Sequence, residues 1–158
     1  MEFVVKSAKA STQKTATLVL PLGDDCLLGS VAQSVDSASG GALSTALKRG
    51  DIQGKAGQTL LLHGLPGLKA ERVLLVGIGK VDELDNRQWR KIANAALAAI
   101  KGLGGADAAF AMQDVQIKGR DNYGRTRLLV EILADGQYVF DQFKSKKADK
   151  PKLKKLSL

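Results

Sequence analysis

Short, continuous apolar runs alternate along this chain with longer segments in which apolar residues recur every three or four positions. Two of these runs are residues 59–63 (TLLLH) and 72–76 (RVLLV), in which apolar residues occupy successive positions. Strands that are buried on both faces of a sheet have this pattern. Because strands separated by helices favour a sheet with helices on both of its faces, the pattern predicts an α/β fold.

Four further runs have the length of strands. They are residues 2–6 (EFVVK), 15–22 (TATLVLPL), 108–112 (AAFAM) and 152–158 (KLKKLSL). In the last of them, Leu153, Leu156 and Leu158 alternate with polar residues, as in a half-buried strand. We expect this strand to pack at the edge of the domain, after a loosely held, lysine-rich connector.

The clearest helix is predicted over residues 86–101. Asp85 precedes it and Gln88 follows three positions later, which is the spacing of a capping box, and Gly102 ends it. One face of this helix is apolar, as a helix packed on a core requires. The residues of that face are Trp89, Ile92, Ala93, Ala96, Leu97 and Ile100.

Residues 29–49 and 123–143 also show helical spacing. Gly40 and Gly41 interrupt the first segment, which is therefore predicted as two helices or one broken helix that ends at Gly50. In the second segment, apolar residues repeat at three and four positions as far as residue 143, which predicts one long helix.

The chain has the size and composition of one globular domain, with 158 residues, 44% of them apolar and 25% charged. This composition excludes a disordered or collagen-like chain. No stretch approaches the roughly 18 uninterrupted apolar residues of a membrane span, and the first residues do not resemble a secretory signal. Cys26 is the single cysteine, which fits a reducing compartment. We therefore expect a cytoplasmic protein without a membrane partner.

Positive charge is concentrated at the end of the chain. Residues 141–158 hold seven lysines and two aspartates, a net charge of +5 out of the total of +8. A basic tail can contact the phosphates of a nucleic acid, but it is more often a solvated linker or a sheet edge. Aromatic residues are scarce and mostly lie at helical spacing, so they do not predict a platform on which bases stack.

Candidate catalytic residues do not form a constellation. His63, the single histidine, stands at the end of an apolar run and is interpreted as a strand-end residue rather than a general base. Cys26 follows two aspartates, and nearby acidic groups disfavour a reactive thiolate. We interpret it as a small buried or surface thiol.

Two further features could bind ligands. Asp82, Glu83 and Asp85 precede a predicted helix, where they favour its positive end without any metal. Gly77-Ile78-Gly79-Lys80 follows a predicted strand, which is a position where α/β proteins bind phosphates, but it lacks a complete phosphate-binding motif and also suits a tight strand-exit turn. We expect no catalytic, cofactor-binding or metal-binding residue in this chain.

Four segments taken together resemble a known family. They are residues 40–50 (GGALSTALKRG), 57–64 (GQTLLLHG), 71–80 (ERVLLVGIGK) and 135–145 (DGQYVFDQFKS). In this order they resemble the N-terminal domain of the leucyl aminopeptidase (cytosol aminopeptidase) family, most closely its proteobacterial members. The resemblance extends over essentially the whole chain.

The resemblance implies a fold and a division into domains. The implied fold is a three-layer α/β/α domain with a mixed central sheet, similar to macro domains. Residues 1–145 would form the non-catalytic N-terminal domain. Residues 146–158 would be the basic connector and edge strand that lead to a C-terminal catalytic domain absent from this sequence.

The resemblance also implies a function for the parent protein. Family members are hexameric metallo-exopeptidases that release N-terminal residues, often leucine, from peptides during intracellular protein turnover. Their two divalent metal ions, manganese or zinc, are held in the C-terminal domain, whose motif Asn-Thr-Asp-Ala-Glu-Gly-Arg-Leu has no counterpart in this sequence. We therefore expect no aminopeptidase activity from this chain alone. Two alternatives remain open: a DNA-binding regulatory module, and a macro-like binder of nucleotides or ADP-ribose.

Overall fold

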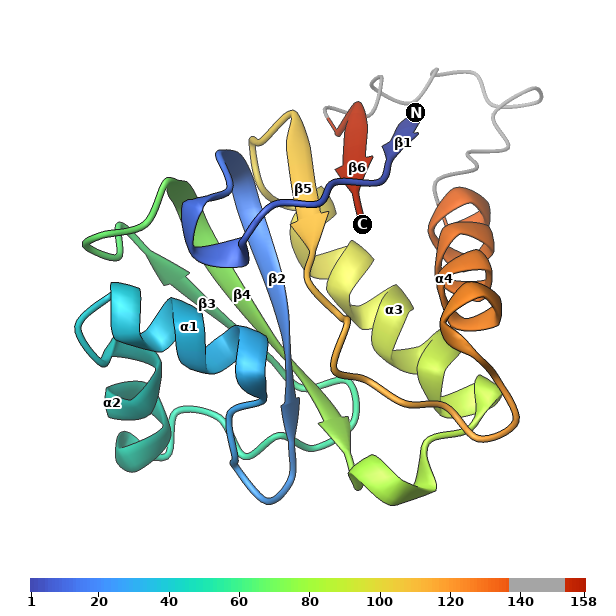
Figure 1. Cartoon of the computed structure of the whole chain (residues 1–158), viewed down its shortest axis with the longest axis horizontal. Coiled ribbons are helices and arrows are strands. Elements are labelled where there is room, and N and C mark those ends of the chain that lie inside the picture. Colours follow the sequence, from blue (N-terminus) through green and yellow to red (C-terminus); the bar gives the residue numbers. More distant parts are fainter. Residues whose placement is uncertain (137–152) are drawn as a thin grey trace, which may run out of the picture.

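The apolar runs lie side by side in one six-stranded sheet (Figure 1). The computed structural model describes residues 1–136 and 153–158. The order of the strands in the sheet is β1-β6-β5-β2-β4-β3. Only β3 is antiparallel to its neighbour, so the sheet is mixed, as predicted. The strands are β1 (Glu2–Val4), β2 (Thr15–Gly23), β3 (Thr59–His63), β4 (Ala70–Gly79), β5 (Asp107–Phe110) and β6 (Lys155–Ser157).

Four α-helices connect these strands within the described residues. The segment interrupted by glycines forms two helices, α1 (Ser30–Ala38) and α2 (Ala42–Arg49), separated by a turn in which Gly41 has a φ of 83°. Helix α3 (Asn86–Lys101) has the predicted bounds, and α4 (Asn122–Asp135) follows β5. Two short 3-10 helices, η1 (Ala10–Thr12) and η2 (Val81–Glu83), complete the described elements.

Strand β4 shows how the three layers form. Its side chains point to alternate faces of the sheet, and each face has its own apolar cluster. Val73 and Leu75 belong to the cluster that contains residues of α1 and α2. Leu74 and Val76 belong to the cluster that contains residues of α3 and α4. The fold is therefore the three-layer α/β/α arrangement that the resemblance implied.

Three sequence predictions need correction. Strand β3 is an edge strand whose leucines are only half-buried, so it is not covered on both faces as its apolar run suggested. Strand β6 lies between β1 and β5 rather than at the edge, which β1 occupies. Helix α4 ends at Asp135, and Gly136 forms a turn after it.

The rest of that predicted helix, residues 137–143, and most of the predicted connector lie outside the described residues. Among the described helices, none combines the length and hydropathy needed to cross a membrane.

Candidate functional site

The parallel strands β2, β4 and β5 end at the same edge of the sheet, which is where the candidate site lies. Open α/β sheets bind ligands in the crevice beyond the carboxyl ends of their parallel strands. A cavity of about 190 Å³ occupies this position. It is lined by the loop after β2, by Ile78 and Val81 near the end of β4, and by Asp114 and Val115 after β5.

Helix α1 begins beside this cavity, and its first turn is bonded to a carboxylate of the same chain. The amide of Val31 donates to Asp114 Oδ2 at 2.9 Å, and the hydroxyl of Ser30 donates to Asp114 Oδ1 at 3.0 Å. A Cβ atom on Gly29 would lie 2.9 Å from Asp114 Oδ2, so a side chain at position 29 would crowd this contact. Because the positive end of a helix attracts anions, Asp114 takes the place that a phosphate occupies at such helices in nucleotide-binding proteins.

The glycine-rich turn at the end of β4, which could be a phosphate site or a tight strand-exit turn, packs against the loop before β3. The amide of Gly77 donates to the carbonyl of Gln58 at 2.7 Å, and the amide of Gly79 donates to the carbonyl of Gly54 at 2.8 Å. A Cβ atom on Gly77 would lie 2.1 Å from the carbonyl oxygen of Lys55. These glycines therefore allow two backbone segments to approach closely, and two of the amides that could hold a phosphate are already donors.

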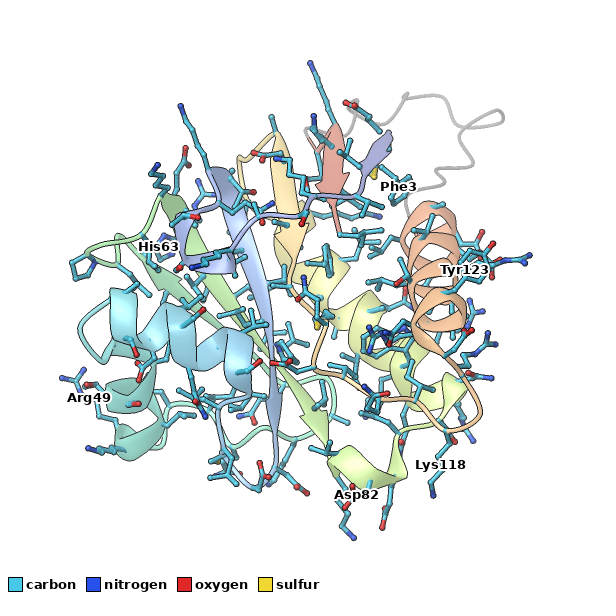
Figure 2. The ribbon with its side chains drawn as sticks, viewed as in Figure 1. Phe3, Arg49, His63, Asp82, Lys118 and Tyr123 are labelled. Atoms are coloured by element: carbon cyan, nitrogen blue, oxygen red, sulfur yellow. The ribbon has the colours of Figure 1, made fainter. Side chains whose placement is uncertain are left out.

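His63 and the acidic residues lie at opposite ends of β4, as Figure 2 shows for His63 and Asp82. His63 is exposed at the end of β3, paired in register with Arg72 near the start of β4. Asp82 is exposed in η2, after the end of β4. The structure therefore does not bring the single histidine together with the acidic cluster.

Of the acidic cluster, Asp85 has the capping role that the sequence predicted, whereas Asp82 and Glu83 lie in η2 before the cap. Asp85 accepts a hydrogen bond from the amide of Gln88 at 2.7 Å, and Gln88 Oε1 accepts one from the amide of Asp85 at 3.3 Å. This reciprocal pair is the predicted capping box of α3. Glu83 forms an ion pair with Lys80 at 3.4 Å. In the described ranges 1–136 and 153–158, no three His, Cys, Asp or Glu side chains are grouped as a metal site.

Cys26 lies in the loop after β2, with a left-handed φ of 56° and a partly exposed side chain. It lines an open groove together with Leu27, Leu28 and residues of α1 and α2. Leu27 is 70% exposed, so this loop carries apolar surface.

Arg125 is a buried charged residue that the sequence analysis did not single out. It lies on α4, is 8% exposed, and donates through Nη1 to the carbonyl oxygens of Gln113 and Val115. Burial lowers the pKa of the Arg125 guanidinium from its ordinary value, and the negative charge of Asp114 opposes that shift. Its helical spacing from Leu128, Leu129 and Ile132 places it on the buried face of α4, which is the signal that could have revealed it.

Comparisons with known proteins identify the family. The model of the N-terminal domain of the cytosol aminopeptidase family matches residues 19–147. The chain is 84% identical, over all 158 residues, to a probable cytosol aminopeptidase of Stutzerimonas stutzeri. This match covers all of the chain and 32% of that relative, so the chain spans about a third of the relative's length.

Solved structures confirm the fold. A mutant of tomato leucine aminopeptidase superposes with a TM-score of 0.77 at 21% identity, covering 99% of this chain and 32% of that one. A Trypanosoma brucei macrodomain superposes with a TM-score of 0.71 at 15% identity, covering 99% of this chain and 60% of that one. At these identities the superpositions show a shared fold, including the predicted likeness to macro domains. The sequence matches, by contrast, establish that this chain belongs to the cytosol aminopeptidase family and corresponds to its N-terminal domain.

Proposed function

We propose that this chain is the non-catalytic N-terminal domain of a cytosolic metallo-aminopeptidase that releases N-terminal residues, often leucine, from peptides. The observation that carries the proposal is the 84% identity, along the whole chain, to one third of a probable cytosol aminopeptidase. The remaining two thirds of such a protein would contain the catalytic domain. In this proposal residues 1–145 form the N-terminal domain, and residues 146–158 lead toward the catalytic one.

The same proposal places the metal chemistry outside this chain. Two divalent ions, manganese or zinc, would be held by the catalytic domain and would activate a water molecule for attack on the peptide carbonyl. The working enzyme would be a homo-hexamer in the cytoplasm. The names of the relatives and the single cysteine at position 26 support that location.

Hydrolysis of leucine p-nitroanilide tests whether the catalytic activity lies outside this chain. The 158-residue chain and a longer protein that includes the downstream coding sequence would be purified in the same way and assayed with added Mn²⁺ or Zn²⁺. We expect turnover by the longer protein, lost on chelation, and none by the shorter chain. Turnover by the shorter chain, after host peptidases have been removed, would contradict the proposal.

Nucleotide binding is the alternative that the macro-like fold raises, and the structure argues against it. The carboxylate of Asp114 is bonded to the amino end of α1 beside the crevice. A phosphate bound at that helix end would be repelled by this negative charge. Calorimetry with ADP-ribose should therefore detect no binding. Saturable binding by the unmodified chain would favour this alternative.

DNA binding is the alternative that the net charge of +8 raises. A gel-shift titration at several salt concentrations separates it from the domain role, because several phosphate contacts make affinity fall steeply with salt. We expect only weak binding, which disappears near physiological salt. Sequence-dependent binding that survives at this salt would support a regulatory module instead.

A further inference from the structure

A second, smaller cavity lies between β5, α3 and α4, and Leu158 after β6 also lines it. Its volume is about 50 Å³, and its walls include Phe110, Met112 and Leu129. One water molecule needs only about 10–15 Å³ on this scale, so the space admits a somewhat larger group. Two donor side chains, Trp89 and Arg125, also line it.

The indole N–H of Trp89 has no acceptor among the described residues. Trp89 is 1% exposed, and its Nε1 atom is buried without a hydrogen-bond partner in the described part of the chain. Buried polar groups are normally hydrogen-bonded, because an unpaired donor loses its hydration without compensation. The cavity beside this side chain offers space for the missing acceptor.

Within the described residues, no carboxylate bonds directly to the guanidinium of Arg125, although the negative charge of Asp114 acts on it. Its hydrogen bonds within residues 1–136 and 153–158 are both made by Nη1, to backbone carbonyls of Gln113 and Val115. The Asp114 carboxylate bonds instead to Ser30 and Val31. A buried charge is usually paired with an opposite one, because desolvation is otherwise uncompensated.

We propose that this cavity binds a small carboxylate of the size of formate or acetate. One carboxylate oxygen would accept from the free N–H groups of Arg125 and the other from the indole of Trp89. Charge-assisted hydrogen bonds of this kind are stronger than neutral ones, and a carboxylate, unlike a water molecule, would bring a negative charge into direct contact with the guanidinium. The apolar walls suit the hydrogen or methyl substituent of such a carboxylate, whereas phosphate has no apolar substituent and carries more negative charge at pH 7 than one guanidinium balances.

The single tryptophan makes the proposal directly measurable. The ¹⁵N-labelled chain has one indole N–H resonance, which would be followed during titrations with sodium formate and sodium acetate at pH 7. Sodium chloride and sodium phosphate at matched ionic strength are the controls. We expect a saturable downfield shift of the indole proton with the two carboxylates and no saturable shift with chloride or phosphate.

Three variants test whether the carboxylate binds in this cavity. Arg125→Gln removes the charge and should weaken carboxylate affinity by at least about tenfold. Arg127→Gln removes a charge from the exposed face of the same helix, where Arg127 pairs with Glu131 at 2.8 Å, and should leave the affinity unchanged. Leu129→Phe keeps both donors but fills the cavity, and should abolish the saturable shift.

The unmodified chain and Leu129→Phe decide the outcome even if Arg125→Gln fails to fold. The absence of a saturable carboxylate shift in the unmodified chain would overturn the proposal. An equal shift in the Leu129→Phe variant, or an equal saturable response to chloride, would also overturn it, because the ion would then bind elsewhere or without selectivity. Whether the aminopeptidase assignment holds does not affect these results.

Discussion

Leu75 is completely buried in the middle of the sheet, on the face covered by α1 and α2. Replacing it by alanine should destabilise the domain by about 2–5 kcal/mol, because the truncation loses apolar contacts and leaves a cavity. Leu62→Ala, on the half-buried edge strand β3, is the matched control and should cost less. Denaturant unfolding measures both, and a cost below about 1 kcal/mol for Leu75→Ala would show that the strand is peripheral.

Asp114 joins the segment after β5 to the start of α1, so its loss should weaken that contact. Asp114→Ala should cost about 0.5–2 kcal/mol, the usual range for a lost helix cap. Because Ser30 donates to the same carboxylate, Ser30→Ala and Asp114→Ala should be non-additive in a double-mutant cycle. Asp24→Ala, at an exposed aspartate, is the control and should change stability by less than about 0.5 kcal/mol. Additive effects of the first two substitutions would refute the proposed coupling.

At the residue scale, the sequence predicts roles that depend on near neighbours and misses those that depend on distant ones. Asp85 and Gln88 are three positions apart, so their capping box was predicted and is confirmed. Asp114 is 84 positions from Ser30, and no local sequence pattern predicts that these two residues bond to each other. Arg125 lies on the apolar face of α4, but its carbonyl partners belong to a loop whose path the sequence does not specify.

At the scale of helices and strands, the sequence likewise predicts what local residues determine and misses what tertiary packing determines. Helix α3 was predicted with its correct bounds because a cap and a glycine mark its two ends. Helix α4 was predicted too long because Gly136 was counted as part of an apolar face rather than as a stop. Strand β3 has a fully apolar core sequence, yet it is an edge strand, and strand order depends on tertiary packing rather than on composition.

The contact between the end of β4 and the loop before β3 should depend on the absence of a side chain at Gly77. Gly77→Ala should destabilise the domain by about 1–3 kcal/mol or more, because the new Cβ meets backbone atoms that cannot rotate away. Gly104→Ala is the matched control, since a Cβ there meets no atom within 4 Å and Gly104 has no positive φ. Thermal unfolding compares the two, and equal stability would show that the loop shifts without cost.

At the scale of the whole molecule, the alternation of strands and helices was enough to predict an α/β fold, but it did not give the strand order. The two ends of the described chain lie side by side, because β6 pairs with β1 in parallel (Figure 1). Phe3 is opposite Leu156 in this pairing, a separation that local sequence patterns cannot bridge. The predicted alternation around Leu153, Leu156 and Leu158 identified the strand but not its place in the sheet.

The interior position of β6 predicts that the end of the chain is part of the fold. Removing residues 153–158 would leave β1 without its partner strand and would expose the edge of β5. It would also remove Leu153 and Leu156, which are buried in the core shared with α3 and α4. We expect this truncation to lower the unfolding midpoint markedly and to promote association, since an unpaired strand edge can pair with another chain. Removing residues 1–5 should have a smaller effect, because β1 is a short edge strand with no buried residue. Circular dichroism melts and light scattering at micromolar concentration measure both variants. An unchanged unfolding midpoint in the chain that ends at residue 152 would contradict this prediction. It would mean that β6 contributes little to stability and that the sheet is stable with β5 as its edge strand.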